Sequence, residues 1–329
     1  MKLFTLLLLA IALLQSCSKD PEHFPGPPVE EPVLPDTLSA SWTKISGFTQ
    51  AFYDIAFAGN SIGYLIGDSG LYKSTDGGFN WKHVSFAVAG DQFLVVVFAS
   101  NLFTIREDTL FKSFDGGATF STQIFDSLLI SKPFFVNATT GYLAGYGQNR
   151  LFKTTDGGHQ WVAVPNINRL YFSSPYIFPF FINETTGWIS NGGDIYYSNG
   201  DVSKWQPVTM LNTTGLLVPF AVDEKTIFLS GRSQNGNGTD IYKSSDGGRS
   251  FTKTAQLASR KMGWPDIHFI DAANGYALAG TSIFATADGG FTWHSEVSMG
   301  NNNIVELYFA DNGHGWACGA NGTILVMKK

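Results

Sequence analysis

The apolar residues of this chain fall in short runs separated by turn-forming residues. The segment 52–85 shows the pattern clearly, with aromatic and aliphatic residues concentrated in 52–57, 63–67, 70–74 and 81–85. Glycine, asparagine, serine and aspartate lie between these runs. Runs of about five residues bounded by turn formers are typical of β-strands. The pattern therefore predicts an antiparallel meander of four strands.

A repeated octapeptide lies between the third and fourth of these predicted strands. Its form is Ser/Thr-x-Asp-Gly-Gly-x-x-Trp/Phe, and its copies occupy 74–81, 113–120, 154–161, 244–251 and 286–293. A degraded copy at 198–205 keeps the outer Ser and Trp but loses the Asp-Gly order. Self-similarity at a regular period predicts an array of one small structural unit.

A second motif links the first and second predicted strands. A glycine followed by Tyr or Trp comes six residues after a phenylalanine in five units: Phe57 and Gly63, Phe135 and Gly141, Phe181 and Gly187, Phe269 and Gly275, Phe309 and Gly315. The constant offset predicts that each phenylalanine and its glycine occupy corresponding positions of neighbouring strands. We expect these residues to pack between adjacent units.

The spacing of the units predicts a closed ring. The aromatic residue that opens the third strand recurs at positions 72, 111, 152, 196, 242 and 284, which differ by 39, 41, 44, 46 and 42 residues. A seventh unit begins at Ile304 and ends without a fourth strand, whereas residues 41–46 match the fourth strand of the other units. An N-terminal strand that completes the last blade removes the open sheet edges. We therefore predict an all-β fold, a seven-bladed β-propeller of four-stranded antiparallel blades over residues 41–329.

The repeats also carry a family resemblance. The octapeptide resembles the Asp box, or BNR repeat, of sialidases, sortilin-type receptors and several glycoside hydrolases, and the whole unit over 41–329 is similar to photosystem II stability/assembly factor-like propellers. The resemblance implies that the box lies on an outer hairpin away from the ligand face. Asp and Ser/Thr side chains satisfy backbone groups in turns, and glycine supplies positive φ. We therefore interpret the box aspartates as structural: Asp76, Asp115, Asp156, Asp246 and Asp288.

The N-terminal residues predict export and lipidation. Lys2 precedes an apolar stretch at 3–14 that is short for a membrane span. The sequence that follows, Leu14-Gln15-Ser16-Cys17, resembles the lipobox of bacterial lipoproteins, which implies a signal peptide at 1–16 and lipid attachment at Cys17. An ordinary secretory signal with a chance cysteine is the alternative. Residues 17–40 are rich in proline and predict an extended tether. This resemblance places the protein in the bacterial cell envelope, periplasmic or surface-exposed, and Ser18 favours the outer membrane.

Composition narrows the classes of partner. The formal net charge of −6 argues against nucleic acid, which needs a basic face. Of the two cysteines, Cys17 is assigned to lipid, so Cys318 is left over and a disulfide framework is excluded. The six histidines form no metal-binding motif, and no nucleotide-binding loop is present. We expect a monomer with neither metal nor cofactor.

Candidate ligand residues lie on the loops that do not repeat. By fold-level analogy, propellers bind at the face formed by the blade-to-blade connections and the loops between second and third strands. Aromatic rings beside guanidinium groups suit sugar or peptide recognition. The candidates are Arg106, Arg150, Arg169, Tyr171, Tyr176 and Trp264. The alternative is that these are ordinary surface loops.

An enzyme is the less favoured interpretation. None of the six arginines lies in the Arg-Ile-Pro sequence of sialidases, and no catalytic residue is assigned. Another glycosidase needs two facing carboxyls, and no spacing singles out a pair among Asp91, Glu107, Asp108, Asp266 and Glu306. The preferred hypothesis is a lipid-anchored, non-enzymatic binding or scaffold module for a protein or glycan partner. The alternative is a glycoside hydrolase or lyase that acts on extracellular glycans, which two facing carboxyls in perturbed environments would favour.

Overall fold

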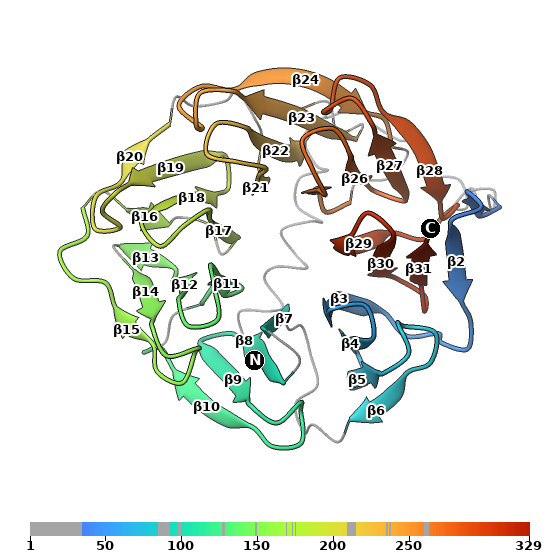
Figure 1. Ribbon diagram of the computed structural model, residues 1–329, viewed down its shortest axis with the longest axis horizontal. Coiled ribbons are helices and arrows are strands. Elements are labelled where there is room, and N and C mark those ends of the chain that lie inside the picture. The colour runs from blue at the N-terminus through green and yellow to red at the C-terminus, as the bar shows by residue number, and fades with distance from the viewer. Residues whose placement is uncertain are drawn as a thin grey trace, which may run out of the picture. The chain divides into compact units, whose positions relative to one another are not determined.

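The computed structural model confirms the all-β, seven-bladed propeller (Figure 1). It describes residues 35–84, 93–97, 100–126, 129–148, 150–168, 170–172, 174, 176–208, 215–234, 236, 238–259 and 263–329, and of 93–97 the backbone alone. Each blade is built on four antiparallel strands, the first of which lies nearest the centre of the ring, and the sheet of blade 6 carries a fifth strand at its outer edge. Among the described residues there is no helix long and apolar enough to cross a membrane.

The strands follow the order of the sequence from the centre outwards. Blade 1 contains β3 (Phe52–Ala58), β4 (Ile62–Gly67), β5 (Gly70–Ser74) and β6 (Lys82–Val84), and blade 2 contains β7 (Phe93–Val97), β8 (Asn101–Arg106), β9 (Thr109–Ser113) and β10 (Ser121–Ile124). Blade 3 contains β11 (Phe134–Phe135), β12 (Gly141–Ala144), β14 (Leu151–Thr154) and β15 (Val162–Ala163), and blade 4 contains β17 (Ile177–Phe181), β18 (Thr186–Asn191), β19 (Asp194–Asn199) and β20 (Gln206–Pro207). Blade 5 contains β21 (Leu217–Ala221), β22 (Ile227–Arg232), β23 (Thr239–Ser244) and β24 (Thr252–Leu257), and blade 6 contains β25 (Asp266–Phe269), β26 (Gly275–Ala279), β27 (Ser282–Thr286) and β28 (His294–Ser298). Blade 7 contains β29 (Ile304–Asp311), β30 (His314–Gly319) and β31 (Ile324–Lys328), and β13 (Gly147–Gln148) pairs with β16 (Tyr171–Phe172) outside the blades.

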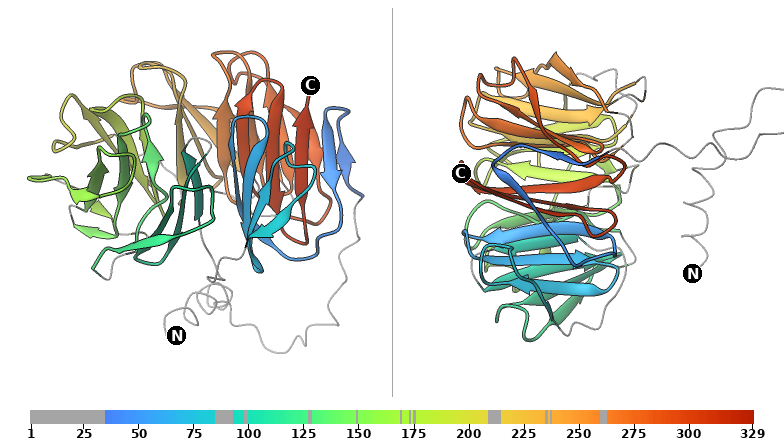
Figure 2. Two further views of the ribbon diagram at one scale, coloured as in Figure 1. Left: turned by 60° about the horizontal axis from the view of Figure 1, so that its bottom comes forward. Right: turned by 90° about the vertical axis from the view of Figure 1, so that its right-hand side faces the viewer.

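The N-terminal strand closes the ring as predicted. Strand β2 (Trp42–Ile45) pairs antiparallel with β31, and Figure 2 shows it beside the last blade. A further strand, β1 (Thr37–Leu38), pairs with β28 of blade 6. The first pairing therefore begins at Thr37, within the segment that the sequence assigns to the tether. Two adjacent blades thus each gain one strand from the N-terminal part of the chain.

The phenylalanine–glycine motif packs neighbouring blades together, as predicted. All five phenylalanines lie directly opposite their glycines, as Phe57 does opposite Gly63. A Cβ atom on Gly63 would lie 2.3 Å from the Phe57 ring, so the glycine makes room for it. In blade 7, Trp316 follows such a glycine and stacks on Phe57 of blade 1 with ring centroids 3.7 Å apart. Tyr142 and Phe181 stack at 3.9 Å between blades 3 and 4.

The repeated octapeptide forms a tight hydrogen-bonded turn. In the first copy the Ser74 hydroxyl donates to Asp76 Oδ1 at 2.8 Å and accepts the Gly78 N–H at 2.9 Å. Asp76 Oδ1 also accepts the Asn80 N–H at 2.9 Å. Gly77 and Gly78 have φ of 79° and 88°, a region that favours glycine. The same three bonds recur in the other copies, and we infer that each box fastens its own turn.

The boxes also receive donors from the preceding blade. Gly116 O in the box of blade 2 accepts from Lys73 Nζ and from the Tyr64 hydroxyl of blade 1, both at 3.0 Å. Across the closure, the Trp316 indole N–H of blade 7 donates to Gly77 O of blade 1 at 2.8 Å. The box backbone is therefore already engaged in holding the blades together.

Candidate functional site

Two of the predicted ligand residues meet at the connections between blades. Tyr176 precedes β17 and Trp264 precedes β25, and their rings make an edge-on contact with centroids 5.0 Å apart. Their blades are the fourth and the sixth, so the contact passes over blade 5. From blade 5 itself, Arg232 at the end of β22 lies over the Trp264 ring at 5.4 Å and donates from Nε to Gly263 O at 3.3 Å. Three blades thus assemble one cluster of two rings and a guanidinium group, which we call the mouth cluster.

The other predicted residues lie elsewhere. Arg106 ends β8 and Arg150 follows β13, and both are exposed. Tyr171 lies in β16, with 59% of its surface exposed. Within the described part of the chain the structure does not bring these three into the mouth cluster. Cys17, Asp91 and Arg169 lie outside the described residues.

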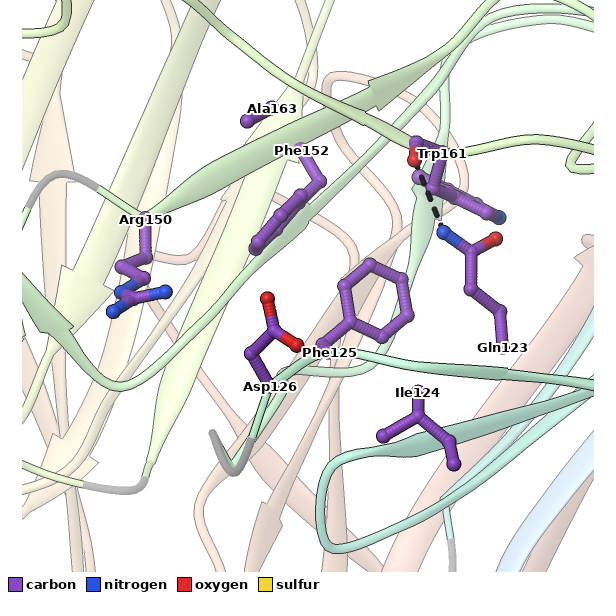
Figure 3. Close-up of a pocket in the computed structure, with 8 residues that line it drawn as sticks. All are labelled: Gln123, Ile124, Phe125, Asp126, Arg150, Phe152, Trp161 and Ala163. Atoms are coloured by element: carbon purple, nitrogen blue, oxygen red, sulfur yellow. Dashed lines mark hydrogen bonds between the residues drawn. The ribbon is translucent and has the colours of Figure 1, made fainter.

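Arg150 instead borders a groove at the rim of the ring. The groove has a volume of about 490 Å³ and lies between the outer strands of blades 2 and 3. Figure 3 shows Arg150 and the Asp126 carboxylate beside the rings of Phe125 and Phe152, which make an edge-on contact at 4.8 Å. The other lining residues are Gln123, Ile124, Trp161 and Ala163.

The centre of the ring holds an ion-pair network that sequence patterns did not reveal. Lys132, just before β11 of blade 3, places Nζ 2.8 Å from Asp54 Oδ2 of blade 1 and 2.8 Å from Glu306 Oε1 of blade 7. Because blade 2 lies between blades 3 and 1, this side chain reaches across the centre of the ring. Side-chain exposure is 1% for Asp54, 31% for Lys132 and 28% for Glu306. Burial alone would lower the pKa of Lys132, but the two carboxylates outweigh it and raise that pKa.

A third carboxyl lies beside this network. Asp266, the first residue of β25 in blade 6, accepts the N–H of Ile267 at 2.8 Å and the N–H of Leu307 at 3.1 Å. Burial raises its pKa well above the usual range, and the negative charge of Glu306 raises it further. The two backbone donors and the charge of Lys132 act in the opposite direction without cancelling the rise. The network therefore joins three carboxyls and one ammonium group from four blades.

An uncharged aromatic layer begins two residues further along the chain, where Phe134 follows Lys132 and His268 follows Asp266. Phe134, Phe180, Phe220 and His268 come from blades 3 to 6, and successive ring centroids lie 4.7, 5.5 and 4.8 Å apart. Burial lowers the pKa of His268 to about 4, so this imidazole is neutral at pH 7. In blade 6, Trp264, Asp266 and His268 thus follow one another at steps of two residues and belong to the mouth cluster, the charged network and the aromatic layer in turn.

A sequence signal for the network exists in retrospect. Asp54, Lys132, Asp266 and Glu306 each lie three residues before the repeated first-strand phenylalanine. Asp266 and Glu306 are among the five carboxyls weighed for a glycosidase from the sequence, and no spacing selects them as a pair. Asp54 and Lys132 are not among those candidates. The equal offset means that the four side chains leave their strands at one level. Within the described residues, no group of three or more His, Cys, Asp or Glu side chains is arranged to hold a metal ion.

Comparisons with known proteins confirm the resemblance to photosystem II assembly-factor propellers. A family model described as photosynthesis system II assembly factor YCF48 matches residues 34–167. A photosystem II assembly lipoprotein Ycf48 from Synechococcus sp. (strain CC9902) is 28% identical over 139 residues, which are 40% of this chain and 42% of that protein. The match thus spans about two fifths of the relative's length.

Solved structures match over most of the fold. The structure of YCF48 from Cyanidioschyzon merolae has a TM-score of 0.67 and 20% identity, with 88% of this chain and 99% of that chain covered. A structure of YCF48 bound to D1 peptide has a TM-score of 0.66 and 18% identity, with 88% of this chain and 97% of that chain covered. At these identities the structural match shows a shared propeller fold.

Proposed function

We propose that this propeller is a non-enzymatic binding module whose mouth cluster contacts a protein partner at the cell envelope. The observation that carries the proposal is the meeting of Tyr176, Trp264 and Arg232 from three blades in one cluster. Trp, Tyr and Arg are the residues that most often dominate the energy of protein interfaces. A solved YCF48 propeller holds a D1 peptide, which supports peptide binding by a ring of this kind. We do not extend the D1 partner of that structure to this chain. The rings of Tyr176 and Trp264 would also suit a glycan ligand.

The test compares partner capture by two variants of the full chain. Photo-crosslinking in envelope membranes, followed by mass spectrometry, identifies the proteins bound by the wild type. Trp264→Ala removes the ring that both Tyr176 and Arg232 contact, and should weaken capture by at least about tenfold. The control is Phe79→Ala, an exposed ring on the box turn of blade 1. If the wild type and Trp264→Ala capture the partner equally well, the mouth cluster is not the binding site.

We also propose that lipid on Cys17 anchors the module, with residues 1–16 as the signal peptide and the outer membrane as its location. The lipobox resemblance supports the lipid anchor, and so does the similarity to the Synechococcus protein, which is a lipoprotein. Anchoring of this kind requires more than one acyl chain for stable attachment. Cys17→Ala should move the full chain from the membrane to the soluble fraction. Membrane attachment of that variant at the wild-type level would defeat the lipid anchor.

A glycoside hydrolase is the second candidate, and one observation favours it. Asp266 has a raised pKa and can hold a proton, while Glu306 beside it is ion-paired with Lys132 as a carboxylate. Two carboxyls in different environments are the arrangement of a glycosidase acid and base. In such a reaction Asp266 would protonate the leaving glycosidic oxygen and Glu306 would activate the incoming water. A polysaccharide panel should then release reducing sugar with the wild type and not with Asp266→Asn, and no release from any substrate would remove this candidate.

A further inference from the structure

We propose that the centre of the ring receives a cationic side chain, lysine or arginine, from the bound protein, with Asp266 and Glu306 as its carboxylate partners. The inference rests on the proposed function, because the mouth cluster must first hold the partner. It adds the chemical class of the group that is recognised.

The chain's own Lys132 shows which group these carboxylates accept. Its ammonium lies 2.8 Å from both Asp54 and Glu306, although the three residues come from different blades. Distances of this size are those of charge-assisted hydrogen bonds. The centre of the ring is therefore already shaped around one alkylammonium group.

At this level of the ring the carboxyl groups outnumber the cationic groups. The charged groups that act on Asp266 are Glu306 and Lys132, and Lys132 is also paired with Asp54. His268 lies on the same strand as Asp266 and is neutral at pH 7. Three carboxyls thus share one ammonium group, and Asp266 has no ion pair with a cation among the described residues. A second cation would reduce the repulsion between Asp266 and Glu306 and would favour the ionised form of Asp266.

The mouth cluster offers a path for the stem of such a side chain. Trp264 lies two residues before Asp266, in the connection that leads into β25, and Tyr176 makes an edge-on contact with the Trp264 ring. Aromatic faces attract cations and also pack against the methylene groups of lysine and arginine. Beyond the carboxylates, the aromatic layer of Phe180, Phe220 and His268 carries no charge at pH 7. A cationic head is therefore best stabilised at the level of Asp266 and Glu306.

Fluorescein-labelled hexalysine is the probe for this site, and fluorescence anisotropy with the full chain is the measurement. Neutral hexa-N-acetyllysine and hexaglutamate are the peptide controls. Asp266→Asn and Glu306→Gln should each weaken hexalysine binding by at least about tenfold. The matched variant is Asp194→Asn, which makes the same change of charge at the first residue of β19 in blade 4 and should leave the affinity within about twofold. Thermal melts establish that each variant is folded. If Asp266→Asn does not fold, the affinity of Glu306→Gln for hexalysine alone tests the proposal.

Proton release gives a second readout that a structural role would not produce. Calorimetry at pH 7 in two buffers of different ionisation enthalpy should detect protons released on hexalysine binding, because a cation beside Asp266 lowers the raised pKa of that carboxyl. Asp266→Asn should abolish this release. The proposal is overturned if hexalysine binds Asp266→Asn as tightly as the wild type, or if Asp194→Asn weakens it equally. If hexalysine fails to bind while crosslinking remains sensitive to Trp264→Ala, the inference that a cationic group is recognised is wrong, but the proposed binding function stands.

Discussion

Replacing Lys132 with methionine should destabilise the ring strongly at neutral pH. The substitution keeps an apolar stem of similar length and removes the ammonium that lies 2.8 Å from Asp54, whose side chain is only 1% exposed. Breaking a buried ion pair by removing one partner typically costs about 3–5 kcal/mol. Without the ammonium group, Asp54 can instead take up a proton and avoid a buried unpaired charge. For a carboxyl of ordinary pKa about 3.9 this protonation costs about 4 kcal/mol at pH 7 and about 1.5 kcal/mol at pH 5, so the loss of stability cannot exceed these values by much. We therefore expect a loss of about 3–4 kcal/mol at pH 7 that shrinks to about 1.5 kcal/mol at pH 5.

Urea unfolding of the full chain at both pH values measures this loss, provided that refolding is reversible. The double variant Lys132→Met/Asp54→Asn removes both charges and should recover at least about half of the loss. Lys44→Met is the matched control, because Lys44 pairs with Asp36 at 2.7 Å on the surface, where such pairs contribute at most about 1 kcal/mol. A loss below about 1 kcal/mol at pH 7, or the same loss at both pH values, would refute the reasoning.

Three further outcomes follow from the repeats. Gly63→Ala should lower the free energy of unfolding by about 1–3 kcal/mol in urea, because the added methyl overlaps the Phe57 ring at 2.3 Å. Ser244→Ala should cost about 1–3 kcal/mol by the same assay, because a buried backbone N–H of the box loses its acceptor. Hydrogen bonds from Thr292 lower the pKa of Asp288 to about 2 in the folded state, so the stability it adds is present above about pH 4. The thermal midpoint should therefore fall as the pH drops from about 4 to about 2, and a midpoint that does not change over this window would contradict the role of the boxes.

The fold could be predicted because the sequence motifs that specify each blade lie within that blade. Each blade repeats the same turn chemistry and the same pairing of phenylalanine with glycine, as in Phe57 and Gly63, and such signals survive in a single sequence. Strand β1 was not predicted because two residues, Thr37 and Leu38, are too few to show a period. Its pairing depends on β28, which lies at the other end of the chain.

The charged centre was not predictable from motifs because its contacts depend on ring geometry. Lys132 and Glu306 are 174 residues apart and belong to blades that are not neighbours. Their equal offset from the repeated phenylalanine shows that they share a level, but it does not show which blades face each other. Tyr176 and Trp264 could be proposed because aromatic residues on connections are conspicuous. Their contact over blade 5 required the closed ring.

The pairing of β2 with β31 also bears on the order in which the chain folds. Trp42–Ile45 are among the first of the described residues to be synthesised, and Ile324–Lys328 are among the last. Contacts between such distant segments form late, because the loop that they close is long. Six blades can assemble while β2 still has no partner strand, and a chain cut short before β31 would keep two open sheet edges. Completion of the last blade therefore waits until β31 has been synthesised.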